Sequence, residues 1–167
     1  MHPLILALFN DPASAAAAAR DLRGLGIARE RVSIVARSHD EEGALADAAG
    51  ASPGSEIEDS AAASRLGELS AHLLAAIALV LPGIGLIVAD GPLAAGLGEA
   101  AGHVAGGIAR ALRQAGMERG EADRWQERIE AGAILVGAHV DDAMVPAVQG
   151  IFGSNRAAST ALARWED

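Results

Sequence analysis

The apolar positions near the start of the chain predict a strand, a helix and a second strand. Residues 4–9 form a short apolar run, and a short run ended by turn residues is typical of a buried strand. Asp11 and Pro12 are favoured at a helix start, and residues 13–25 follow with alanine and leucine side chains on one face. Residues 31–36 are rich in β-branched side chains, which favour a strand. This region predicts one β-α-β or split β-α-β unit.

The pattern near the other end predicts a matching half. Residues 118–131 form a charged helix whose inward face carries Trp125. Residues 133–140 form an apolar run whose alternate residues Ile134, Val136, Ala138 and Val140 share one face of a strand, and a helix capped by Asp141-Asp142 then runs to about residue 152. Both halves together predict an α+β fold, in which the two chain ends build a small three-stranded sheet with covering helices.

The chain between the halves predicts an acidic linker and a helical hairpin. The linker, residues 38–60, contains seven acidic residues and no arginine, which is typical of a solvated connector. An uncharged run at residues 71–89 is interrupted by Pro82 and Gly83, and a helical pattern resumes at residues 93–115. We expect an Ala/Gly-rich hairpin with arms at about 61–81 and 93–115, its turn set by Pro82 and Gly83. The predicted division of the chain is therefore 1–37 and 118–153 for the two halves of the α+β domain, 38–60 for the linker, 61–117 for the hairpin and 154–167 for a tail.

Three glycines of the second arm recur every four residues. Gly98, Gly102 and Gly106 share one stripe of a helix, where the absence of side chains lets another backbone approach closely. Glycine inside a helix costs up to about 1 kcal/mol relative to alanine, so three in register indicate a close contact that offsets this cost. The stripe predicts packing between helices, and homo-oligomerisation as its main use.

The composition excludes several classes of protein. The 167 residues include 40 Ala and 20 Gly, no Cys and no Lys, 2% aromatic residues and a net charge of −9. A disulfide scaffold and a thiol nucleophile require Cys, and nucleic-acid binding requires positive charge and stacking side chains, so we expect no nucleic-acid partner. No basic segment precedes the first apolar run, so the sequence predicts a cytoplasmic protein without a signal peptide.

Two environments for the hairpin remain open. Residues 71–89 are uncharged over nearly the length of a membrane span, and Arg65, Arg110 and Arg113 would lie together at the open end of the hairpin. Glu99 and His103 oppose membrane insertion because polar groups are costly inside a bilayer. A hairpin packed against copies of itself is therefore favoured, with peripheral attachment at the inner membrane as the alternative.

Two Glu/His pairs are the candidate metal ligands. Glu68 with His72 and Glu99 with His103 are each four residues apart, so each pair shares a helix face. Helical bundles build divalent metal sites from such residues, but the spacing is not the Glu-x-x-His of di-iron bundles. Solvated or hydrogen-bonded polar residues are the favoured interpretation, and we expect no cofactor and no metal.

The remaining polar residues indicate no enzyme. The chain contains neither a phosphate-binding loop with its lysine nor a Gly-x-Ser-x-Gly nucleophile motif. His139 falls on the outward side of its strand, where a solvated imidazole is expected, and Trp165 in the tail is either exposed or docked on a neighbour.

The central segment resembles that of a known bacterial family. Residues 80–85 (VLPGIG) and 91–95 (GPLAA) are similar to the PGIG…GPLAA segment of general stress proteins of the YflT type, and residues 124–136 are similar to the helix, glycine and strand that follow it. The resemblance implies stress-linked expression and a non-enzymatic role. His72, Glu99 and His103 depart from the family pattern, because small apolar residues are expected there.

The sequence therefore predicts a non-catalytic stress-family protein that self-assembles, attaches to the membrane surface, or does both through its glycine-striped hairpin. The alternative is a scaffold or carrier subunit, whose oligomerised hairpins bind a lipid or quinone or anchor a larger enzyme complex.

Overall fold

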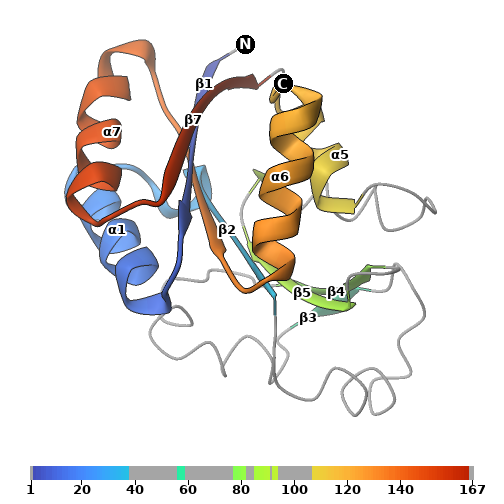
Figure 1. The fold of residues 1–167 in the computed structure, drawn as a ribbon. Coiled ribbons are helices and arrows are strands. Elements are labelled where there is room, and N and C mark those ends of the chain that lie inside the picture. The colour runs from blue at the N-terminus through green and yellow to red at the C-terminus, as the bar shows by residue number, and fades with distance from the viewer. Residues whose placement is uncertain are drawn as a thin grey trace.

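The two chain ends form one antiparallel sheet with helices on both faces (Figure 1). The computed structural model describes residues 2–37, 56–58, 77–81, 85–90, 92–93 and 107–165. The sheet strands from the chain ends are β1 (His2–Phe9), β2 (Val32–Arg37), β6 (Ile134–His139) and β7 (Ser159–Trp165). The helices are α1 (Pro12–Gly24), α5 (Gly107–Gln114), α6 (Arg119–Glu130) and α7 (Val145–Ser154), with short 3₁₀ turns η1 (Arg29–Arg31) and η3 (Asp142–Met144).

The four strands are connected as two interlocked split β-α-β units. Their order in the sheet is β2-β6-β1-β7, and each neighbouring pair is antiparallel. Helix α1 joins β1 to β2 with β6 between them, and α7 joins β6 to β7 with β1 between them. The predicted α+β class and its origin in both chain ends are confirmed.

The predicted three-stranded sheet is wrong, because the chain ends supply four strands, and the fourth lies in the segment predicted as a tail. Residues 159–165 of the tail form β7, which pairs with β1 over seven residues from Ser159 to Trp165. This strand lies at the edge of the sheet, and Ala163 is its one buried residue. Its sequence therefore shows little of the apolar alternation that identifies a strand.

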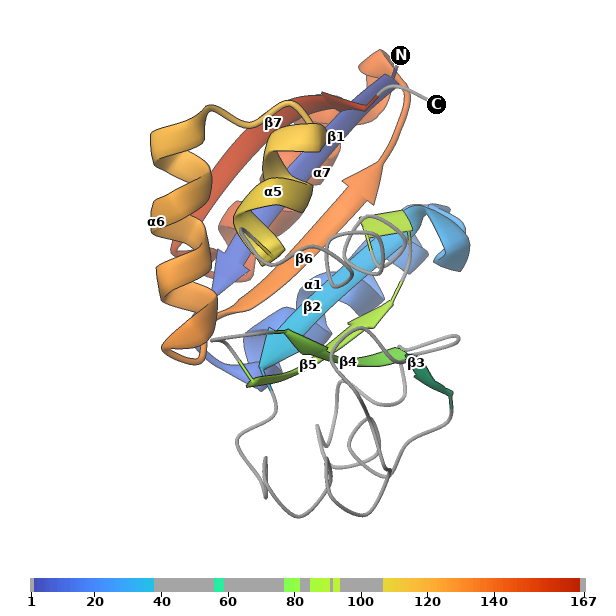
Figure 2. The same cartoon turned by 90° about the vertical axis from the view of Figure 1, so that its right-hand side faces the viewer.

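The central segment extends the sheet beyond β2 (Figure 2). Strands β5 (Gly85–Asp90), β4 (Ile77–Leu81) and β3 (Glu56–Glu58) follow β2 in that order, all antiparallel. The predicted helix over 61–81 is therefore wrong at 77–81, because a short apolar run rich in β-branched residues suits a strand as well as a helix. The end of the second arm is confirmed as helix α5, and Leu93 at its start is described, whereas residues 61–76 and 94–106 of the two arms lie outside the described residues.

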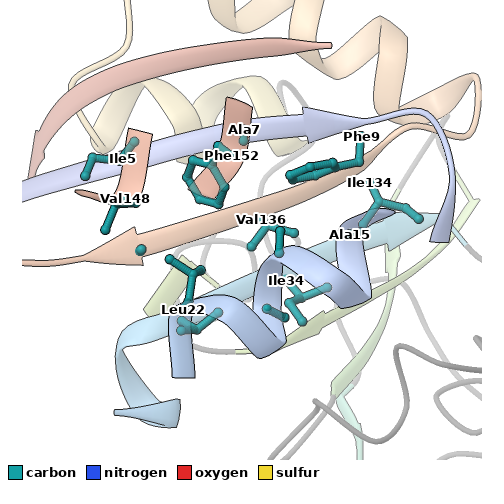
Figure 3. Close-up of a cluster of buried hydrophobic side chains, with 14 of the residues drawn as sticks. Ile5, Ala7, Phe9, Ala15, Leu22, Ile34, Ile134, Val136, Val148 and Phe152 are labelled. Atoms are coloured by element: carbon teal, nitrogen blue, oxygen red, sulfur yellow. The ribbon is translucent and has the colours of Figure 1, made fainter. Parts of the chain in front are cut away.

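One core lies between the sheet and the α1/α7 layer (Figure 3). Phe9 of β1 meets Phe152 of α7 edge to face, with ring centroids 5.9 Å apart. Four alanines of α1 face the sheet and are buried, which lets the helix backbone approach the strands closely: Ala15, Ala16, Ala18 and Ala19. Within the part of the chain described, no helix is long and apolar enough to cross a membrane.

A second core lies on the opposite face, under α5 and α6. Leu4, Leu6 and Leu8 of β1 point into it, and they meet Leu112 of α5 and the predicted core residue Trp125 of α6. Residues 4–9 of β1 therefore alternate between two cores, and every one of them is 0% exposed.

The helix starts agree only in part with the sequence. Asp11 caps α1 as predicted, because its Oδ1 accepts a hydrogen bond from the backbone N–H of Ser14 at 2.8 Å. Glu118 caps α6 in the same way. The predicted Asp141-Asp142 cap is wrong: Asp141 makes no side-chain cap bond, because the chain first forms η3 and α7 begins only at Val145.

The Asp11 cap makes stability depend on pH. Backbone and side-chain hydrogen bonds from Ser14 hold the pKa of the Asp11 carboxyl below its ordinary value. The cap therefore stabilises the fold fully above the carboxyl's pKa in the unfolded chain, and this contribution is lost as the pH falls through the lowered pKa of the folded state. Asp11→Asn keeps an acceptor oxygen that does not titrate. We expect the urea midpoint of the native chain to exceed that of Asp11→Asn at pH 7 and to lose this excess between about pH 5 and pH 2. A difference that does not change with pH would contradict the role of the carboxylate.

Candidate functional site

The site residues predicted from sequence all lie outside the described residues. This holds for the candidate metal ligands Glu68, His72, Glu99 and His103, and for the hairpin residues Pro82, Gly83, Gly98, Gly102 and Gly106. Pro82 and Gly83 fall between the paired ends of β4 and β5, where Leu81 lies opposite Gly85. Across the ranges that the structure describes, no three His, Asp or Glu side chains are grouped to hold a metal ion.

The described residues form a cleft at one end of the sheet. Because neighbouring strands run antiparallel, β1 and β2 begin at the end where β6 and β7 finish. A hollow of about 380 Å³ opens there, which we call the sheet-end cleft; it is lined by His2, Arg31, Pro92, His139, Val140, Asp141 and Trp165. A second hollow of about 410 Å³ shares Arg31, His139, Val140 and Asp141 as its wall and continues to Gly26, Ile27, Ala28 and Met144.

Three aromatic rings from three strands meet on one side of this cleft. His2 Nε2 and His139 Nδ1 lie 2.9 Å apart and share a hydrogen bond, in which the tautomers decide which nitrogen donates. The His139 ring also meets Trp165 edge to face, with centroids 5.3 Å apart. Strand pairing sets this geometry, because His2 lies opposite Trp165 and Leu4 opposite His139 in the sheet register.

Two expectations for these residues are corrected or resolved. His139 was expected to be solvated, but it is 4% exposed, because β7 and the start of β1 close over the end of β6. Trp165 is partly buried and packs on its own chain, against His139 and the α5/α6 core. Neither contact is visible in the sequence, since 137 residues separate His2 from His139.

The lining of the cleft also carries charged side chains. The exposed Arg31 guanidinium forms no ion pair with any residue that the structure describes, and Asp141 is likewise exposed beside it in the cleft lining. Asp142, next along the chain, lies 3.9 Å from Arg164 of β7. A cleft with a flat aromatic wall, imidazole nitrogens and one available guanidinium suits a compact ligand that carries a ring and hydrogen-bond acceptors.

The histidine pair predicts a measurable coupling. His2→Ala and His139→Ala each remove the shared hydrogen bond, so their effects should not add: a double-mutant cycle in urea should give a coupling of about 1 kcal/mol. As a control, His2→Ala combined with Phe152→Ala should be additive, because Phe152 packs on Phe9, about 23 Å along β1 from His2. Additivity within about 0.3 kcal/mol for the histidine pair would mean that the contact contributes nothing.

Comparisons with family models, with curated proteins and with solved structures give no significant match. The features that bear on function are therefore those of the chain's own residues. They are the sheet-end cleft with its aromatic and cationic side chains, the sheet that helices cover on both faces, and the glycine-rich segment of residues 61–117.

Proposed function

We propose that this chain is a non-catalytic protein that assembles with copies of itself through its Ala/Gly-rich segment, residues 61–117. The α+β unit from the chain ends is the platform that carries the segment. The observation that supports this most is that α1, α7, α5 and α6 already bury both faces of the central strand β1. Both faces of β1 are thus buried by described helices that contain none of Gly98, Gly102 and Gly106, and we assign the glycine spacing to contacts with another copy.

Two anchors fix the glycine stripe to the platform. Before the stripe, the backbone N–H of Leu93 donates to Ser33 Oγ of β2 at 3.2 Å, and both residues are buried. After the stripe, α5 packs into the α5/α6 core, and the backbone N–H of Ala109 donates to Gln126 Oε1 of α6 at 2.9 Å. Residues 94–106, which contain Gly98, Gly102 and Gly106, therefore connect two fixed points, which limits where a partner can meet them.

The proposal includes the setting in which the protein acts. The resemblance to general stress proteins supports stress-linked expression without catalysis. The proposed location is the cytoplasm, and the uncharged run of residues 71–89 supports peripheral contact with the inner membrane. Cell fractionation before and after stress measures both the abundance of the protein and its membrane-bound share.

Substitution within the glycine stripe tests self-assembly. Gly102→Leu places a bulky side chain where the stripe needs close backbone approach, so we expect the molar mass from light scattering to fall well below that of the unsubstituted protein. Gly24→Leu is the matched control, because a Cβ at Gly24, the last residue of α1, meets no atom within 4 Å. An assembly that survives Gly102→Leu unchanged, in a chain with native circular dichroism, would refute assembly through the stripe.

The sheet-end cleft supports a second candidate function, that of a carrier for a small molecule. Its volume of about 380 Å³ lies within the range of small-ligand sites and is better matched to a compact ring than to a long acyl chain. The exposed Arg31 offers a guanidinium to carbonyl oxygens, and Trp165 offers a flat apolar wall. Of the lipid and quinone ligands expected from sequence, the cleft therefore favours a quinone head group.

Tryptophan fluorescence measures binding in the cleft. The chain has two tryptophans, so Trp125→Phe leaves Trp165 as the sole reporter. We expect a short-chain benzoquinone to change its emission in a saturable way, and Arg31→Ala to weaken the binding several-fold by removing the available cation. A linear, non-saturating decrease that is identical in both proteins would indicate collisional quenching and remove this candidate.

A further inference from the structure

We propose that the outer edge of β7 pairs with β7 of a second copy, antiparallel and about a two-fold axis at Ala161, so that the sheet of one copy continues into the other. This inference rests on the proposed function of self-assembly and assigns it a second surface, on the platform, away from the glycine stripe. It follows from the direction of the backbone groups of β7, from the turn that covers one end of the strand, and from the side chains that the pairing brings together.

Contacts on both sides of β1 show which way the backbone groups of β7 point. The Pro3 carbonyl accepts the N–H of Val140, so Pro3 directs its carbonyl toward the β6 side. The Leu8 carbonyl accepts the N–H of Ala158 on the β7 side. Backbone N–H and C=O groups alternate in direction along a strand. Those of Leu4, Leu6 and Leu8 therefore point toward β7, whereas those of Ile5 and Ala7, like the Pro3 carbonyl, point toward β6. Residues 160, 162 and 164, opposite Ala7, Ile5 and Pro3, therefore point their N–H and C=O groups away from β1.

The turn after α5 confirms this direction and limits the open edge. A Cβ built on Gly116 would lie 3.1 Å from the carbonyl oxygen and 3.3 Å from the amide nitrogen of Arg164. Both atoms of Arg164 thus face the turn, and Gly116 tolerates the close approach and its positive φ of 94° because it has no side chain. Among the residues that the structure describes, the turn covers the edge at Arg164, and no strand pairs with the outer side of residues 159–163, which have Ala161 at their centre.

The open edge lacks the devices that usually prevent pairing between strands. Edge strands are commonly protected by proline, lysine or a bulge, because their unpaired backbone groups attract another strand. The β7 sequence STALARW contains neither proline nor lysine, and its register with β1 is continuous over seven residues. In Figures 1 and 2, β7 crosses the molecule between the α7 and α6 sides, with no described strand beyond it.

Pairing about Ala161 is complementary in both hydrogen bonds and side chains. It sets Thr160 of one copy opposite Leu162 of the partner subunit, and the reverse, so the outward N–H and C=O groups of both residues find partners. Leu162 is 53% exposed and stands on the face of the α1/α7 core, because Ile5 opposite it belongs to that core. The contact covers this leucine with a threonine side chain, and neither of these two paired residues is charged.

Charge favours a second copy over another extended segment as the occupant. The chain has a net charge of −9, so most of its surfaces repel a copy of themselves, but β7 contains no acidic residue. Its one charged side chain, Arg164, lies beyond the open residues and is 3.9 Å from Asp142 of its own chain.

Cysteine cross-linking tests both the contact and its register. The natural chain has no cysteine, so each introduced thiol is unique. Ala161→Cys places its thiol directly across the axis from that of the partner subunit, where opposed Cβ atoms lie about 4.5–5.5 Å apart, and should give a disulfide-linked dimer on mild oxidation. Thr160→Cys and Leu162→Cys should each cross-link poorly alone, at a diagonal separation of about 7–8 Å, but well when the two proteins are mixed.

The outcomes separate this inference from the proposed function when every variant is also made with Gly102→Leu. Cross-linking of Ala161→Cys that persists in the Gly102→Leu chain supports the β7 contact even if assembly through the stripe fails. An assembly that Gly102→Leu disperses, together with no cross-link at Ala161→Cys, would refute the β7 contact and leave the proposed function standing. Thr160→Cys alone that cross-links as well as the mixture would refute the register. Circular dichroism confirms that each variant is folded.

Discussion

The pairing of β1 with strands on both of its sides is the constraint on which the rest of the structure depends. β1 pairs with β6 on one side and β7 on the other, while residues 4–9 are 0% exposed because their side chains enter two cores. A strand with neighbours at both edges and on both faces has its register fixed by every contact at once, since a shift of one residue would exchange the two cores. Helices α1 and α7 cross over this strand pairing, so the helical layers follow from it.

The cleft and the open edge both result from this arrangement. β1 brings His2 to the ends of β6 and β7, which buries His139 and completes the aromatic wall with Trp165. The same pairing uses the backbone groups of alternate β7 residues and directs those of Thr160 and Leu162 outward. The proposed ligand site and the proposed assembly surface therefore share strand β7: Trp165 at its end lines the cleft, and Thr160 and Leu162 lie on its outer edge.

The alanine content has a structural role in the platform. The buried alanines of α1 allow the helix to lie close to the sheet, and the paired rings of Phe9 and Phe152 fill the wider space toward α7. Small side chains bury little area each, so the core depends on close packing over many positions. The glycine stripe of residues 98–106 lies outside the described residues, and its regular spacing is the reason that we assign it to contacts between copies.

The sequence by itself determined β1, α1, β2, α6 and β6, because each has a clear apolar period, and it identified the Asp11 cap and the buried Trp125 from local signals. Only the tertiary structure decided the elements and contacts whose signals are not local. Residues 159–165 became a strand because β1 offers them a free edge, and residues 77–81 became one because β5 lies beside them. The position of His139 in its strand predicted a solvated side chain, but two distant chain segments bury it in the structure. The sheet-end cleft could not be predicted, because its walls meet only through pairing between the two chain ends. Local periodicity fixes what a segment can form, whereas burial and free strand edges, which arise only when distant segments meet, decide what each residue contacts.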